Sequence, residues 1–253
     1  MKHLKKKLLF SLFSDPAGED FAYHAYKYLY FRTSEFEPGS VRDAVNELVS
    51  EGLVDKLRRN RQSWFRLTAT GRGVLLKNLH FLARQEPWDR HWRMVILVGK
   101  IGAALRPLQR ELQALGYQHL SRGIYLCAAN VSEKTRDLLV EKHWLNQAVV
   151  IESRRVLGAD DQQLARNLWH LESLAEQYDQ FITLSDRLLK LSRRNLVLLQ
   201  QAKFGFKAVF NAYFKLLLEE PALPKALLPP NWTAEAAGDL FWRLVELAKT
   251  AKI

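Results

Sequence analysis

The sequence has almost no cysteine and no long apolar run. Of its 253 residues only Cys127 is a cysteine, which excludes a disulfide framework within one chain and suits a reducing compartment. Cys127 lies inside an apolar run, where we expect a small buried core residue rather than a reactive thiol. Because no charge-free run exceeds ten residues, no segment is expected to span a membrane. We therefore expect a cytoplasmic protein.

Motifs of the common enzyme and metal sites are also missing. The chain has no G-x-x-x-x-G-K or G-x-G-x-x-G phosphate-binding loop and no G-x-S-x-G nucleophile turn. Its histidines are scattered and lack the spacing of metal ligands. The acidic pair Asp160-Asp161 precedes a helical stretch, where negative charge stabilises the helix N-terminus. We expect no catalytic residue, no metal ion and no bound cofactor.

Basic residues outnumber acidic ones, and the excess is uneven along the chain. The formal net charge is +11, from 38 Lys and Arg against 27 Asp and Glu. Residues 1–86 and 87–157 each carry an excess of +5, whereas residues 158–253 carry +1. The distribution favours a polyanionic partner for the first two thirds of the chain. Charge alone does not decide this, because mildly basic proteins are common.

The first block, residues 1–86, shows the element order of a winged helix. An apolar stripe repeats at helical spacing from Val41 to Leu48, and Pro38 suits the first turn of that helix. A polar turn at Arg58–Gln62 then separates two short strands. The expected elements are helices over 3–13, 21–31 and 38–50, strands over Leu53–Arg58 and Ser63–Leu67, and a helix over 71–83.

The second block, residues 87–157, alternates strands and helices. It opens on a continuous apolar strand, and we expect Ser132 to cap its second helix. The order β-α-β-β-α-β is typical of a ferredoxin-like domain. The expected elements are strands over Met94–Val98, Tyr117–Leu120, Gly123–Ala128 and Ala148–Ile151, with helices over Ala103–Leu115 and 132–143.

The third block, residues 158–253, is almost entirely helical. Periodic stretches cover Leu164–Phe181 and Thr183–Leu218, and a proline-rich loop precedes a last helix over Thr233–Ala251. The block is rich in aromatic residues, which suit either an aryl ligand or simple helix packing. These residues are Trp169, Tyr178, Phe204, Phe206, Phe210, Tyr213 and Trp232.

Opposite its apolar stripe, the helix over 38–50 carries four polar side chains: Ser40, Arg42, Asp43 and Asn46. Arg42 and Asn46 are four residues apart, so they project from the same face. In the major groove, arginine pairs with guanine and asparagine with adenine, each through two hydrogen bonds. The same residues would also suit the solvated face of any amphipathic helix.

The hairpin after this helix carries a dense cluster of cations. Four of them fall within six residues and a fifth lies on the return strand: Lys56, Arg58, Arg59, Arg61 and Arg66. Cations this close repel one another unless a polyanion neutralises them. Beside a candidate recognition helix, the natural partner is a phosphate backbone or a minor groove. We therefore predict that both sets of residues contact DNA.

Phrases spread over all three blocks point to one family. The N-terminal phrases are Val41–Ala44, Glu51–Val54 and Arg58–Thr68, and the middle ones are Trp88–Trp92, Leu112–Tyr117 and Ser121–Tyr125. The C-terminal ones are Leu168–Leu171, Tyr178, Phe181 and the proline-rich Glu220–Trp232. In order and spacing, these phrases resemble the PaaX-like transcriptional repressors, named for control of phenylacetic acid catabolism.

The resemblance implies an α+β protein with three domains. Residues 1–86 would form a winged-helix DNA-binding domain, 87–157 a ferredoxin-like domain akin to a small CRISPR-associated nuclease, and 158–253 a helical domain for effector and dimer contacts. It also implies a homodimer on a palindromic operator, released by an aryl-CoA thioester such as phenylacetyl-CoA. Arg42 would lie in the recognition helix, with Arg58, Arg59 and Arg61 in the wing.

Two other functions stay open at this point. A metal-dependent nuclease using the ferredoxin-like domain would need an acidic residue at the end of its first strand. Gly99-Lys100 occupies that position, and Asp89 lies before the strand. A protein-interaction scaffold without an operator is the second alternative.

Overall fold

The computed structural model describes residues 2–13, 22–79, 87–98, 106–154, 160–192 and 199–250. Within these ranges the chain is a mixed α/β protein with two antiparallel sheets. It forms two compact units: unit 1 joins Met1–Ala83, Gln177–Glu219 and Ala234–Ile253, and unit 2 joins Arg84–Glu176 and Glu220–Thr233. In the described ranges, no helix is both long and apolar enough to cross a membrane. The division into three blocks stays a prediction.

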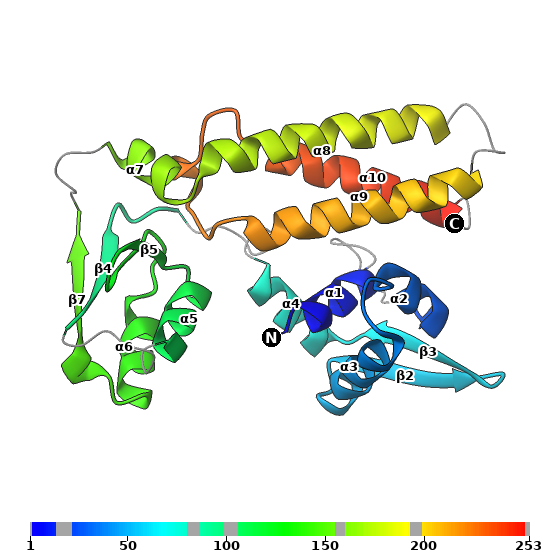
Figure 1. Ribbon diagram of the computed structural model, residues 1–253, viewed down its shortest axis with the longest axis horizontal. Coiled ribbons are helices and arrows are strands. Elements are labelled where there is room, and N and C mark those ends of the chain that lie inside the picture. The colour runs from blue at the N-terminus through cyan, green and yellow to red at the C-terminus, as the bar shows by residue number, and fades with distance from the viewer. Residues whose placement is uncertain are drawn as a thin grey trace. The chain divides into compact units, whose positions relative to one another are not determined.

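The N-terminal part of unit 1 contains three helices, a small sheet and a fourth helix. Its elements are α1 (His3–Leu12), β1 (His24–Ala25), α2 (Tyr26–Arg32), α3 (Pro38–Ser50), β2 (Val54–Arg59), β3 (Gln62–Leu67) and α4 (Ala69–Asn78). The strand order is β1-β3-β2, and the hairpin β2–β3 extends beyond α3 (Figure 1). The prediction of a helix over 21–31 was wrong at its start, because His24 and Ala25 are extended and pair with β3.

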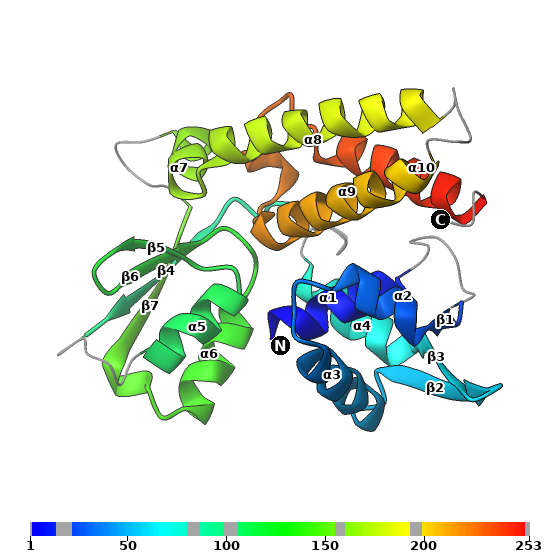
Figure 2. The same ribbon diagram turned by 45° about the vertical axis from the view of Figure 1, so that its right-hand side comes forward.

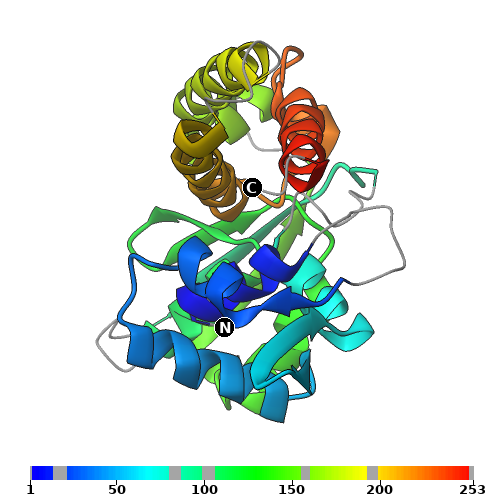
Figure 3. The same cartoon turned by 90° about the vertical axis from the view of Figure 1, so that its right-hand side faces the viewer.

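Helix α1 is buried among the helices of unit 1. Phe10 is 1% exposed and lies in a cluster of aromatic rings contributed by α9 (Leu199–Glu219) and α10 (Ala234–Thr250). Its ring centroid is 5.1 Å from that of Phe210 and 5.7 Å from that of Phe241. The end-on view in Figure 3 shows α8, α9 and α10 side by side. The first helix of the chain therefore shares a core with its last helices.

The long helices differ from the periodic stretches expected for residues 164–218. The chain breaks between α7 (Asp161–Leu168) and α8 (Leu171–Ser192), where His170 has a φ of 51°. No break occurs after Phe181, since α8 runs through this position and the Thr183 hydroxyl donates to the Asp179 carbonyl oxygen one turn earlier. The Asp160 carboxylate caps α7 by accepting from two backbone N–H groups, which confirms a helix-terminal role.

Unit 2 contains a four-stranded sheet in the order β5-β6-β4-β7. Helices α5 and α6 lie on one face of this sheet (Figure 2). Its elements are β4 (Trp92–Leu97), α5 (Arg106–Ala114), β5 (Gln118–Ser121), β6 (Ile124–Cys127), α6 (Ser132–Glu141), the 3-10 turn η2 (Leu145–Gln147) and β7 (Ala148–Ser153). The strands and helices alternate in the order expected from the sequence.

Alternating residues of this sheet form two cores. Val95, Tyr125 and Cys127 face α5 and α6, and burial confirms Cys127 as a core residue, with its pKa raised to about 11. Trp92 and Leu126 face the opposite way, against α7 and the proline-rich segment. That segment includes the 3-10 turn η4 (Lys225–Leu227). Three leucines of the segment are buried: Leu223, Leu227 and Leu228. The proline-rich segment is thus part of the core of unit 2.

Two glycines of α4 make a matched test of packing in unit 1. A Cβ at Gly71 would clash with the Leu53 carbonyl oxygen, whereas a Cβ at Gly73 meets nothing within 4 Å. We expect Gly71→Ala to lower the free energy of unfolding by about 1–3 kcal/mol or more. Gly73→Ala should raise it by up to about 1 kcal/mol through helix propensity. Urea unfolding of both variants measures the difference, and equal effects would contradict this packing.

Candidate nucleic-acid interface

Helix α3 separates an apolar face from a polar one, as its sequence predicts. Val41, Val45 and Leu48 are buried, and Pro38 starts the helix. The side chains of Ser40, Arg42, Asp43 and Asn46 are all exposed. The helix therefore offers a polar face on which an arginine and an asparagine project together.

The acidic residues near the end of α3 share one cation within unit 1. The Lys5 ammonium of α1 lies 2.8 Å from the Glu47 carboxylate and 2.6 Å from that of Glu51. The hydrogen bond to Glu47 raises the pKa of Lys5, and the same bond lowers the pKa of Glu47. One ammonium offsets one of the two carboxylate charges, so this end of α3 keeps part of its negative charge.

The tip of the β2–β3 hairpin is tighter than the five-residue turn expected from the sequence. Pairing continues to Arg59 and Gln62, which leaves Asn60 and Arg61 as a two-residue loop. Both have left-handed backbones, with φ of 49° and 62°, as in the type I′ turns that twist hairpins correctly. Asparagine tolerates this region, whereas a glycine is usual at the second position. Arg61 therefore holds a strained conformation at the tip.

The predicted cations of the hairpin fall into two groups. Lys56, Arg58, Arg59 and Arg61 are exposed, and within the described chain no carboxylate forms an ion pair with any of these four. Arg66 is different, because its Nη2 lies 2.6 Å from Asp55 and its guanidinium lies 4.8 Å from the Tyr23 ring centre. Arg66 thus holds the two strands of the hairpin together across the sheet.

A hollow of about 450 Å³ lies between α3, the hairpin and the start of α2. Arg42, Asn46 and Lys56 all line it, so the helix and the hairpin contribute to one surface. Sequence reasoning missed four further polar lining residues, namely Tyr26, Lys27, Gln62 and Ser63. Tyr26 and Lys27 follow β1, so their position depends on the pairing of β1 with β3. The positions of Gln62 and Ser63 depend on the register of β2 and β3. Burial raises the pKa of Tyr26, and the charge of Arg42 partly opposes this shift.

Asp89, the carboxylate considered for a nuclease site, is engaged by a buried arginine. Arg93 is 2% exposed, and its guanidinium donates to both oxygens of Asp89, with Nη1 3.1 Å from Oδ1. Ser132 is not a helix cap, because its hydroxyl accepts from Arg93 Nε at 3.0 Å and donates to Glu152. Gly99-Lys100 lies outside the described residues. Among the described residues, no group of three His, Cys, Asp or Glu could hold a metal ion.

The Asp89–Arg93 pair predicts an acid-sensitive part of the stability of unit 2. The hydrogen bond from Arg93 lowers the pKa of Asp89, so the stabilisation is complete above pH of about 4 and is lost as pH falls through the lowered pKa. At neutral pH, Asp89→Asn should cost about 1–3 kcal/mol, because it leaves a buried guanidinium short of its counter-charge. Unfolding measured from pH 7 downwards checks this, and a variant equal to wild type at pH 7 would contradict it.

Comparison with known proteins places two parts of the chain in described domain families. Residues 85–165 match the PaaX protein central Cas2-like domain, and residues 169–252 match the PaaX-like protein C-terminal domain. The Escherichia coli (strain K12) protein named transcriptional repressor PaaX is 24% identical over 207 residues, which span 79% of this chain and 66% of the relative's own length, just under two thirds.

A similar fold also occurs in a solved structure. The uncharacterized protein Rv0674 from Mycobacterium tuberculosis has a TM-score of 0.59 at 18% sequence identity, and the match covers 98% of this chain and 97% of that chain. At this identity the likeness concerns the fold alone.

Proposed function

Because the chain belongs to the PaaX-like family, we propose that it is a DNA-binding transcriptional repressor that contacts its operator through α3 and the β2–β3 hairpin. This proposal rests on one observation: Arg42 and Asn46 of α3 and Lys56 of the hairpin line the same hollow. It combines groups that read base edges with a cation that binds phosphate. The proposal assigns the chain no catalytic activity.

The order of elements in unit 1 supports a winged helix for this part of the chain. In that fold the recognition helix enters the major groove and the hairpin lies along the backbone. We assign base contacts to Arg42 and Asn46, with Ser40 and Asp43 beside them. We assign phosphate contacts to the hairpin cations that form no ion pair with a described carboxylate, namely Lys56, Arg58, Arg59 and Arg61. Arg66 acts through Asp55 by holding the hairpin.

We also propose a fold for unit 2, an oligomeric state, an effector and a location for the chain. The order β4-α5-β5-β6-α6-β7 and the antiparallel sheet support a ferredoxin-like domain. By analogy with its family, the chain would bind a palindrome as a homodimer, and an aryl-CoA thioester would release it. By analogy with the Escherichia coli repressor, we place the chain in the cytoplasm.

Selection from a random pool of duplex DNA tests the proposal. The purified chain should enrich one short palindromic sequence. Arg42→Ala should lose preference at the base pair that Arg42 reads, at a cost of about 1–3 kcal/mol for that position. Lys134→Ala, an exposed cation on α6, is the matched control and should keep the wild-type preference. Recovery of no preferred sequence would support a protein-interaction scaffold instead.

Arg61→Gly should separate folding from DNA binding. Glycine adopts the left-handed backbone at no steric cost, so the free energy of unfolding should stay within about 1 kcal/mol of wild type. Affinity for the selected duplex should fall and the slope of log affinity against log salt should flatten by roughly 0.9. Fluorescence anisotropy at several salt concentrations measures both quantities. An unchanged affinity in a folded variant would remove Arg61 from the interface.

A further inference from the structure

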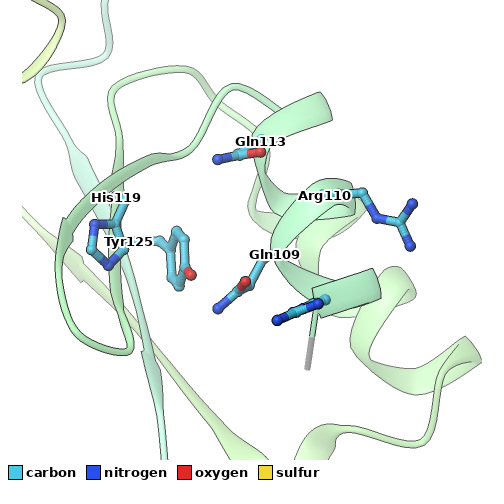
Figure 4. Close-up of a pocket in the computed structure, with 6 residues that line it drawn as sticks. Gln109, Arg110, Gln113, His119 and Tyr125 are labelled. Atoms are coloured by element: carbon cyan, nitrogen blue, oxygen red, sulfur yellow. The ribbon is translucent and has the colours of Figure 1, made fainter. Parts of the chain in front are cut away.

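A second polar groove lies in unit 2, on the side of the sheet covered by α5. Its described lining comes from one face of α5 and from the β5–β6 hairpin, around a hollow of about 760 Å³ (Figure 4). The lining residues are Arg106, Gln109, Arg110, Gln113, His119 and Tyr125. None of them belongs to the surface assigned to DNA contact in unit 1.

The α5 side of this groove is a stripe of cations and amides. Arg106, Gln109, Arg110 and Gln113 follow the spacing i, i+3, i+4, i+7 and so share one helix face. The opposite face of α5 is anchored in the core by Leu108 and Leu112, both 0% exposed. Neither arginine forms an ion pair with a described carboxylate. Two like charges on successive turns repel each other, so an anion between them would be stabilised.

The β5–β6 hairpin contributes two aromatic rings to the groove, from His119 and Tyr125. Tyr125 is 2% exposed, and in Figure 4 its ring lies between His119 and Gln109. The ring centroids of His119 and Tyr125 are 5.3 Å apart. Burial raises the pKa of Tyr125 and a hydrogen bond with Gln109 opposes the shift, so the phenol stays protonated at neutral pH and can donate.

We propose that this groove binds a small molecule that carries phosphate groups. Two guanidinium groups offer planar pairs of donors that match phosphate oxygens, and the amides and the phenol add neutral donors. None of the described lining residues is acidic. A small molecule fits better than a nucleic-acid strand, because the cations are confined to two turns of one helix instead of following a long track. The proposal does not depend on DNA binding by unit 1.

Isothermal titration of the full chain with inorganic pyrophosphate tests the proposal. We expect binding with Kd below about 1 mM at low salt. The double variant Arg106→Gln/Arg110→Gln should weaken it by about tenfold or more, and Tyr125→Phe should weaken it to a smaller extent. Arg136→Gln removes an exposed arginine from α6 of the same unit and should bind pyrophosphate as wild type does.

Three results would overturn the assignment of this groove. The first is no binding of pyrophosphate by the folded wild-type chain, and the second is equal weakening by Arg136→Gln and by the double variant. The third is loss of duplex binding in the double variant, which would make the groove a DNA contact. We expect that variant to keep wild-type affinity for the selected duplex. If no duplex is selected but pyrophosphate still binds, the proposed function fails and this inference survives.

Discussion

Replacing Arg58, Arg59 and Arg61 together by alanine will sharply weaken binding to duplex DNA. All three side chains are exposed on the hairpin and lack described carboxylate partners, so their charge is available to phosphates. Each lost phosphate contact should flatten the salt dependence by roughly 0.9, giving a change of up to about 2.7. If each exposed contact contributes up to about 1 kcal/mol, affinity falls by as much as roughly 100-fold.

A variant with the same change in net charge controls for non-specific electrostatics. Arg122→Ala, Lys134→Ala and Arg136→Ala together remove three exposed cations from unit 2. Affinity and salt slope are measured by anisotropy with one duplex for both triple variants. The unit 2 variant should retain a slope close to wild type. If both slopes change equally, or if the hairpin variant keeps the wild-type slope, the hairpin is not the phosphate-binding element.

Phe10→Ala will destabilise unit 1 severely. Phe10 is fully surrounded by aromatic rings, and its removal leaves a cavity between α1 and the helices α9 and α10. Truncation of a buried phenylalanine costs about 3–5 kcal/mol, a large part of the stability of an ordinary domain. Equilibrium unfolding in urea should therefore show a much lower midpoint for this variant.

Leu184→Ala is a suitable control for that loss. Leu184 is an apolar residue of α8 that is 47% exposed, and its truncation should change the free energy of unfolding by within about 0.5 kcal/mol. A loss below about 1 kcal/mol for Phe10→Ala would mean that α1 does not share a core with the C-terminal helices.

Most elements of unit 1 and unit 2 could be predicted because their apolar patterns are local. The stripe of α3 predicts a helix, and the continuous apolar runs of β4 and β6 predict strands that are buried on both faces. The short strand β1 could not be predicted. Its two residues are extended because of pairing with Phe65 and Trp64, some forty residues further along the chain.

The candidate DNA surface shows the same division between local and distant information. The exposed face of α3 and the cations of the hairpin followed from spacing and charge. The partner of Arg66 did not, because only the strand register places Asp55 opposite it. The positions of Tyr26 and Lys27 beside the hollow between α3 and the hairpin also depend on contacts between separate elements. Likewise, no local pattern shows that the proline-rich segment packs on the sheet of unit 2.

The central claim is that α3 and the β2–β3 hairpin form the DNA-binding surface. Photo-crosslinking of the full chain to its selected duplex, followed by mapping of the crosslinked peptides, tests this most directly. We expect crosslinks within Pro38–Ser50 and Val54–Leu67, including Arg42 and the hairpin tip. Crosslinks concentrated in unit 2, or none to α3 and the hairpin, would contradict it.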